Sequence, residues 1–323
     1  MGVTVKAGGG KVSPTRSLIA AVGSFIVAHW LLAVFSPFVL RALYRRYVSP
    51  LRKYPGPFVA SFSRLWKVIS TASGNTYTHH IALHRKYGPV VRIAPNEVSI
   101  SSPEAARTLL SAGKRFFKTP FYGVFPPPEN PDIFTETREE VHAQKKRVAN
   151  VPYSMAAMQQ LSPFIDDTIE LLARKIDAHI ANDAGVFDLG DWLHYFAFDV
   201  LGEVAFSRSF GFLEQGRDVD KAIKTIDNSQ TYNGIVGQVP ELDYLLRRNP
   251  LWQFIPWLST KNALITRMAL EEMARRRPFD KETAVLKTRD GRQDLMASLI
   301  LGHLKDPEKF REGDVFAVAH GAM

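Results

Sequence analysis

The chain has 323 residues, with 41 basic against 32 acidic side chains and a net charge of +9 at neutral pH. It contains no cysteine, which excludes disulfides, thiolate zinc sites and cysteine nucleophiles within these residues. The first 53 residues carry 8 of the basic side chains and no acidic one, so the remainder is close to neutral. The excess charge therefore indicates contact with anionic lipid headgroups and no nucleic-acid partner.

An uncharged apolar run of 23 residues extends from Leu18 to Leu40. At about 1.5 Å per residue it reaches roughly 34 Å, enough for a hydrocarbon core of about 30 Å. We expect residues 1–17 to be disordered and residues 18–40 to be a transmembrane anchor. The flanking basic residues are Lys6, Lys11 and Arg16 before the run and Arg41, Arg45, Arg46, Arg52 and Lys53 after it. Their excess behind the run favours a cytoplasmic body.

Two other interpretations of this run remain open. A cleaved signal peptide is disfavoured because the run is longer than a typical h-region and no small-residue cleavage site follows. A buried helix of a soluble protein is disfavoured because such helices seldom extend this far without a charge.

Residues 41–57 predict a basic, Pro/Gly-rich linker that ends in a stiff, non-helical Tyr-Pro-Gly-Pro connector, and we place the domain boundary there. Two β-rich runs, Val90–Ala94 and Val98–Ser101, predict a β-hairpin with a turn at 95–97. Ser102-Pro103-Glu104 then supplies an N-cap, a first-turn proline and a first-turn acid for a helix through Leu110.

Beyond the hairpin we expect mainly helices. Ser162-Pro163 indicates the start of one helix, because apolar residues follow at intervals of three and four. A second runs from Trp192 to Phe206, and others are expected at about 218–232, 259–277 and 293–304. Asp314 can cap a last helix whose residues Val315–Ala319 are apolar on every side, which is typical of a core helix. Nothing after it remains to cover it, so we expect an exposed apolar end.

Common catalytic motifs are missing from the sequence: the nucleophile elbow, the P-loop, the dinucleotide fingerprint and the H-E-x-x-H zinc motif. His80 and His84 are four residues apart, beside His79, and two imidazoles at that spacing can hold a metal. No acidic partner lies at motif spacing. A partly exposed helix face is therefore the favoured interpretation.

The segment EEVHAQKKRVANVPYSM, residues 139–155, carries a better candidate site. On a helix, His142 and Lys146 are one turn apart and face the same way, with Arg147 adjacent. A ring and a cation on one face can bind a buried anionic group such as a carboxylate. The alternative is that the Lys-Lys-Arg run is a solvated helix surface.

Several segments together resemble a fungal, endoplasmic-reticulum cytochrome P450 of the pisatin-demethylase-like group. They are the apolar anchor, the Pro-Gly-Pro connector, KYGPVVRIAPNEVSISSPEAARTLL, EEVHAQKKRVANVPYSM and FDLGDWLHYFAFDVLGEVAFSRSFGFLEQG. Each is moderately specific, whereas five in the right order and spacing are a strong signal. The resemblance implies a mainly α fold with a small β-sheet, in which an N-terminal transmembrane helix precedes an incomplete cytochrome P450 domain over residues 58–323.

The resemblance also implies a function. Members of that family use haem to oxygenate small lipophilic molecules, receive electrons from an NADPH-dependent reductase, and lie on the endoplasmic reticulum membrane facing the cytoplasm. One of their helices presents an aromatic residue followed four positions later by Arg, and both contact haem propionates. His142 and Lys146 occupy those positions here. Lysine in place of arginine loses the bidentate fork of a guanidinium.

The sequence departs from the family at decisive points. REGDVFAVAHGAM matches the lead into the central helix of the family, but the Ala-Gly-x-x-Thr segment, the Glu-x-x-Arg pair and the cysteine loop that ligates haem iron do not occur. We therefore expect a truncated chain that is catalytically inactive alone and does not bind haem stably. A gene-model error, a pseudogene and a real short product all remain open. The alternative function is a non-catalytic, membrane-tethered binding or scaffold protein.

Overall fold

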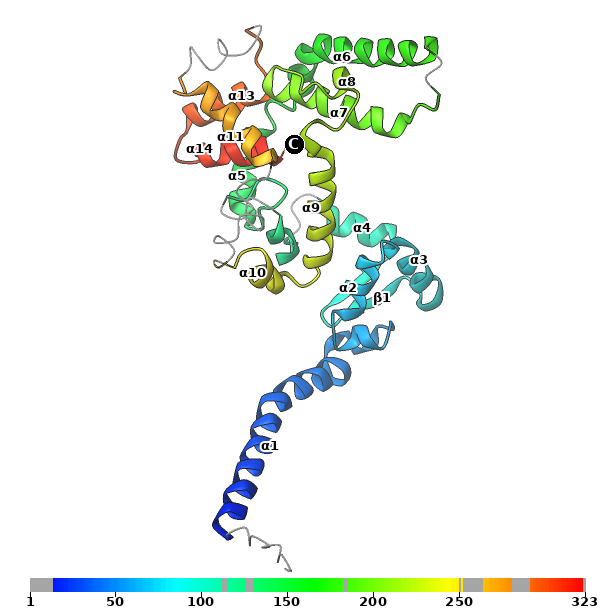
Figure 1. Ribbon diagram of the computed structural model, residues 1–323, viewed down its shortest axis with the longest axis vertical. Helices are drawn as coiled ribbons and strands as arrows, with labels where there is room; N and C mark the ends of the chain where they lie inside the picture. The colour runs from blue at the N-terminus through cyan, green and yellow to red at the C-terminus, as the bar shows by residue number, and fades with distance from the viewer. Residues whose placement is uncertain are drawn as a thin grey trace, which may run out of the picture. The chain divides into compact units, whose positions relative to one another are not determined.

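The computed structural model describes residues 14–111, 116–125, 130–182, 185–249, 251, 264–280 and 291–321. Over these residues the chain is mainly α-helical and contains one two-stranded sheet (Figure 1). The predicted fold class, mainly α with a small β-sheet, is confirmed. The chain divides into two compact units, residues 1–111 and residues 112–323, and each is described by itself.

The first unit begins with α1, Pro14–Leu43, which continues as a short π-helix, η1, Tyr44–Val48. Val22–Val48 is a candidate membrane span by length and composition, with a mean hydropathy of 1.8 and no part of its most apolar window buried. Helix α1, Pro14–Leu43, begins before Leu18 and ends after Leu40, the limits of the predicted apolar run. It is compatible with a membrane anchor, and the domain limits at residues 17, 40 and 57 stay predictions.

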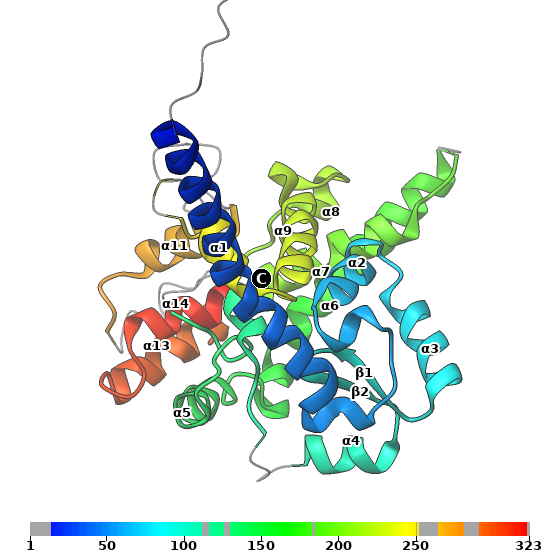
Figure 2. The same cartoon turned by 90° about the horizontal axis from the view of Figure 1, so that it is seen from below.

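The rest of this unit surrounds the hairpin (Figure 2). Its elements are η2 (Pro50–Lys53), η3 (Val59–Ser61), α2 (Leu65–Ala72), α3 (Thr76–Tyr87), β1 (Val90–Ala94), β2 (Glu97–Ile100) and α4 (Pro103–Leu110). The strands are antiparallel, with Val90 opposite Ile100 and Arg92 opposite Val98. The Ser102 hydroxyl accepts a hydrogen bond from the backbone N–H of Ala105 at 3.3 Å and caps α4. The predicted hairpin and the helix after it are confirmed.

The Pro-Gly-Pro connector packs along β1. The backbone N–H of Arg92 donates to the carbonyl oxygen of Pro55 at 2.7 Å. A Cβ on Gly56 would lie 2.1 Å from the carbonyl oxygen of Arg92, closer than any side chain tolerates. Glycine is therefore required at this position by the close approach of two backbone segments.

The second unit contains the remaining elements. They are η4 (Pro120–Val124), α5 (Glu139–Ala149), α6 (Met155–Ala181), α7 (Leu189–Phe206), α8 (Phe212–Gln215), η5 (Val219–Lys221), α9 (Ala222–Val236), η6 (Pro240–Leu242), α10 (Asp243–Leu246), α11 (Leu264–Arg276), α13 (Leu295–Lys305) and α14 (Glu312–Gly321). The long helices α6 and α7 lie side by side. The start of the helix expected over 259–277 lies outside the described residues.

The expected helix start at Ser162 is wrong. Helix α6 begins at Met155, where the Ser154 hydroxyl accepts a hydrogen bond from the Ala157 N–H at 3.3 Å. Pro163 lies inside the helix. A proline costs one backbone hydrogen bond there, and a helix of 27 residues retains enough others to continue.

The apolar core of the second unit is formed by α7, α11, α13 and α14. Its fully buried members include Phe206, Met296, Leu299, Ile300, Phe310 and Val315. Val315 and Ala317 are 0% exposed, and Val318 and Ala319 are nearly so, because α11 and α13 pack against α14. The expectation of an exposed apolar end at Val315–Ala319 is therefore wrong: residues that precede it in the chain cover it.

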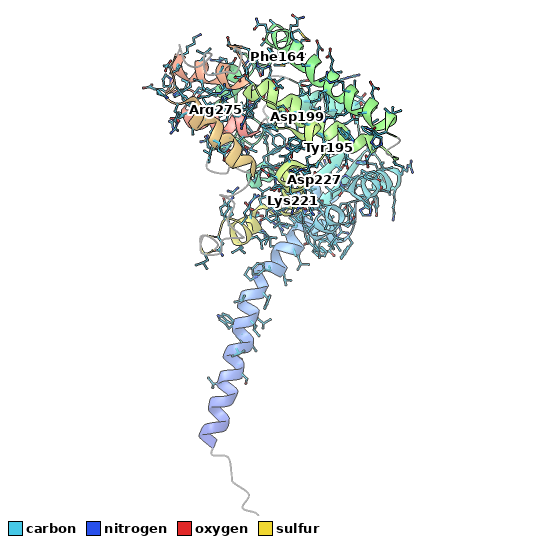
Figure 3. All side chains as sticks on the ribbon, turned by 45° about the horizontal axis from the view of Figure 1, so that its top comes forward. Phe164, Tyr195, Asp199, Lys221, Asp227 and Arg275 are labelled. Atoms are coloured by element: carbon cyan, nitrogen blue, oxygen red, sulfur yellow. The ribbon has the colours of Figure 1, made fainter. Side chains whose placement is uncertain are left out.

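A buried carboxylate fixes the turn from α7 to α8. Asp199, labelled on α7 in Figure 3, is fully buried and accepts four hydrogen bonds, from the backbone N–H groups of residues 210–213 at 2.8–3.2 Å. Tyr195, one turn earlier, stacks on Phe212 with ring centroids 6.2 Å apart. The first N–H groups of a helix have no carbonyl acceptor within it, and the Asp199 carboxylate supplies that acceptor for α8.

Candidate functional site

The candidate site lies on α5, Glu139–Ala149. The helix carries Glu139 and Glu140 in its first turn and Lys146 and Arg147 in its last, so its charged ends match the helix dipole. It has no side-chain N-cap. Its stability therefore depends on packing against the rest of the second unit, and Val148 contacts Gly302 on α13.

His142 and Lys146 lie one turn apart on α5, as predicted. The side chain of His142 is 18% exposed, and its Nδ1 lies 3.7 Å from Oε1 of Glu139, too far for a hydrogen bond. That nitrogen is buried and has no hydrogen-bond partner among the described residues. Lys146 is exposed, and its ammonium makes no hydrogen bond or ion pair with any described residue. The pair thus presents one unsatisfied ring nitrogen and one uncommitted ammonium.

Lys145 belongs to the Lys-Lys-Arg run for which a solvated helix surface is the alternative interpretation, and it is almost fully buried. Its ammonium donates to the carbonyl oxygen of Pro131 at 2.5 Å and lies 3.0 Å from Asp314 and 3.6 Å from Glu136. A sequence signal did exist, because positions 142, 145 and 149 share one helix face. The ammonium joins α5 to the segment before it and to the first turn of α14.

We call the contacts of Lys145 with Pro131, Glu136 and Asp314 the Lys145 junction. Within it, Glu136 is bound by Arg138 as well as by Lys145. Burial raises its pKa, but hydrogen bonds from Arg138 and the nearby charge of Lys145 outweigh that effect and lower the pKa to about 2. The Arg138 guanidinium binds both carboxylate oxygens at 2.8 Å. Glu136 is therefore ionised at neutral pH and fixes the loop that leads into α5.

The residues present offer hydrogen-bond donors for a haem propionate but no thiolate for the haem iron. A propionate carboxylate could accept hydrogen bonds from the buried Nδ1 of His142 and from the ammonium of Lys146. The iron side lacks its ligand in these residues, because none of the 323 is a cysteine. Whether this chain binds haem through His142 and Lys146 stays a prediction.

The histidine pair of the first unit has a structural role. His84 Nδ1 lies 2.9 Å from the Gly88 carbonyl oxygen, which can only accept, so Nδ1 carries the proton. The other ring nitrogen, Nε2, lies 2.7 Å from the Ser99 hydroxyl, which His80 also approaches at 3.4 Å. These bonds attach α3 to β2. Within the described residues, no three His, Cys, Asp or Glu side chains gather as a metal site would require.

Comparison with known proteins gives a consistent result. The sequence pattern of the family described as Cytochrome P450 matches residues 55–320. The cytochrome P450 monooxygenase mpaDE of Penicillium brevicompactum is 35% identical over 226 residues, 68% of this chain and 26% of that protein. The cytochrome P450 monooxygenase cicH of Emericella nidulans is 34% identical over 67% of this chain and 44% of its own length. A cytochrome P450 monooxygenase of Aspergillus terreus is 30% identical over 85% of this chain and 58% of its own length.

The chain therefore spans about a quarter to three-fifths of the length of these relatives. The matched family pattern covers α2 to α14, including α5 and both sides of the Lys145 junction.

Proposed function

Because the chain belongs to the cytochrome P450 family, we propose that it serves in the haem-thiolate monooxygenation of a small lipophilic, secondary-metabolite-like molecule. The observation that carries this proposal is the family match over residues 55–320. The relatives named above support it, since each is itself called a monooxygenase.

In this proposal α5 supplies the haem-binding residues of the chain. His142 donates a hydrogen bond from its buried Nδ1, and Lys146 adds a point charge, so that one propionate is held and its charge is neutralised. Haem with a thiolate ligand, when bound, supplies an iron that activates oxygen, and the thiolate favours cleavage of the O–O bond. Lys145 keeps the helix in place through Glu136 and Asp314.

The thiolate cannot come from these 323 residues, since they contain no cysteine. We propose that they do not oxygenate a substrate by themselves. The α1 helix would hold the body on the endoplasmic reticulum membrane, facing the cytoplasm, where an NADPH-dependent reductase supplies electrons.

Spectroscopy tests both parts of this proposal. The full chain is expressed with haem supplied, and the difference spectrum of the reduced protein with carbon monoxide is recorded. We expect no band at the long wavelength typical of a thiolate ligand, and such a band would disprove the claim of inactivity. Haem titration should show weaker binding in H142A and K146A than in R147A, which removes an exposed cation from the same helix. Equal affinity in all three variants would remove the role of His142 and Lys146.

A second candidate is a non-catalytic, membrane-tethered binding or scaffold protein, and the buried state of α14 favours it. Val315 and residues 317–319 are buried against α11 and α13, so most of the apolar side chains of α14 are covered. Limited proteolysis of the full chain in detergent distinguishes the two. A protease-resistant body without haem supports the scaffold function. Rapid cleavage throughout residues 112–323, reversed only by haem, supports the first proposal.

A further inference from the structure

The first unit contains a group of arginines that form no ion pair with a carboxylate among the described residues. Glu97 is the first acidic residue of the chain, so every charged side chain before it is basic. Glu97 forms an ion pair with Lys67. Arg45 and Arg46 lie on η1, where the candidate membrane span ends, and Arg92 lies on β1. We call Arg45, Arg46 and Arg92 the arginine cluster.

Arg92 is the buried centre of the cluster, with an exposed fraction of 2%. Its Nη2 donates to the carbonyl oxygens of Arg45 at 2.8 Å and Pro95 at 2.7 Å, and its Nε donates to that of Ala94 at 3.4 Å. These acceptors are neutral. Its Nη1 is buried and has no hydrogen-bond partner among the described residues. The backbone thus positions the guanidinium, and no described carboxylate compensates its charge.

Arg46 completes the same pattern. Its guanidinium lies 5.5 Å from the ring centroid of Phe58 and 5.5 Å from that of Tyr47, and its Nε is also buried without a hydrogen-bond partner in the described part of the chain. Burial, together with the charges of Arg46 and Arg45, lowers the pKa of Arg92. Arginine nevertheless stays protonated in proteins, so the cluster keeps its positive charge.

Such an arrangement is costly unless an anion joins it. Burying a charge without a counter-ion is strongly unfavourable, because the charge loses its hydration. No described acidic side chain pairs with any member of the cluster. Guanidinium groups match the geometry of phosphate oxygens and bind them bidentately. A phosphate would therefore satisfy the donors and the charge of the cluster.

The position of the cluster indicates where the phosphate comes from. Arg45 and Arg46 lie within the last turn of the candidate span, Val22–Val48. Tyr44 and Tyr47, on the same turn, are 55% and 59% exposed, and exposed tyrosines at the end of a span are typical of the membrane–water interface. If α1 spans the bilayer, the cluster lies at the depth of lipid headgroups.

We propose that the arginine cluster binds the phosphate of an anionic phospholipid headgroup where α1 leaves the membrane. This inference rests on the proposed anchoring of α1 and adds a lipid-specific site to it. Bound lipid would fix the end of the anchor against β1, because Arg92 already holds the carbonyl oxygen of Arg45.

The test measures binding of short-chain phosphatidic acid to the full chain in a neutral detergent, by calorimetry. We expect R46Q and R92Q to bind at least about tenfold more weakly than the unmodified chain, a loss of about 1.4 kcal/mol. K53Q is the matched control, because it removes one exposed cation from the same segment and should change the affinity less than twofold. R46K separates charge from geometry and should restore binding only in part. Circular dichroism of each variant confirms that it is folded.

Several outcomes would overturn the proposal. If K53Q weakens binding as much as R46Q, bulk charge explains the affinity. If inorganic phosphate binds as tightly as the lipid, the cluster is a site for free phosphate. If short-chain phosphatidylcholine competes equally, the site has no preference for anionic lipid. The anchoring of α1 is tested separately by flotation with phosphatidylcholine vesicles. If the full chain does not float with them, the anchoring proposal is wrong.

Discussion

The ammonium of Lys145 on α5 lies 3.0 Å from the carboxylate of Asp314 in the first turn of α14. Both side chains are largely buried, and the carboxylate of Glu136 lies 3.6 Å from the same ammonium. Lys145 thus places one cation between the carboxylate of Glu136, which Arg138 also binds, and that of Asp314 on α14.

Replacing Lys145 by alanine should destabilise the second unit. The change leaves the buried carboxylate of Asp314 without a cation, and breaking a buried pair from one side costs roughly 3–5 kcal/mol. Lys146→Ala removes an exposed neighbour and should cost within about 0.5 kcal/mol. Urea unfolding of both variants, followed by tryptophan fluorescence, measures the difference. Equal midpoints for the two would show that the Lys145 junction contributes nothing.

Replacing Asp199 by alanine should destabilise the turn between α7 and α8. Four backbone N–H groups lose the Asp199 carboxylate, although that of Gly211 keeps its bond to the Ser209 hydroxyl, and an unsatisfied buried donor costs about 1–3 kcal/mol. Asp199→Asn keeps one oxygen and should cost less. Hydrogen exchange at residues 210–213 reports the effect directly. Slow exchange in the alanine variant would mean that another acceptor replaces the carboxylate.

Local sequence signals predicted part of this structure. The hairpin and the cap at Ser102 are encoded by adjacent residues, so they could be inferred without a fold. The helix face of Lys145 could be inferred in the same way, but the partners of Lys145 and Asp199 could not, because they are distant in sequence: Asp314 for one, and N–H groups 11–14 positions onward for the other. The burial of α14 was missed for the same reason. The helices that cover α14, α11 and α13, precede it in the chain, and periodicity alone cannot predict that they pack against it.

Replacing Gly56 by alanine should destabilise the first unit by about 1–3 kcal/mol, the usual cost of inserting a methyl group where there is no room. The added Cβ would collide with the Arg92 carbonyl oxygen and push the connector away from β1. Faster exchange of the Arg92 amide, which donates to Pro55, is the specific readout. Gly123→Ala is the matched control, since nothing lies within 4 Å of its Cβ position. An unchanged Arg92 amide in G56A would contradict the prediction.

The attachment of α3 to β2 should weaken as the pH falls. Burial lowers the pKa of His80, and the charges of His84, Lys67 and His79 lower it further. A histidine whose folded-state pKa lies below its unfolded value near 6.5 stabilises the fold fully above that pH. This stability is lost as the pH falls below it, because the unfolded chain takes up the proton more readily. Because intrinsic exchange itself slows as the pH falls, the readout is the protection factor: protection of residues 76–87 should decrease by about a few-fold or more between pH 7.5 and pH 5.5, an acceleration relative to the intrinsic rate. In His80→Gln, which cannot be protonated, the acceleration should shrink. If the two chains respond identically to pH, titration of His80 is not the cause.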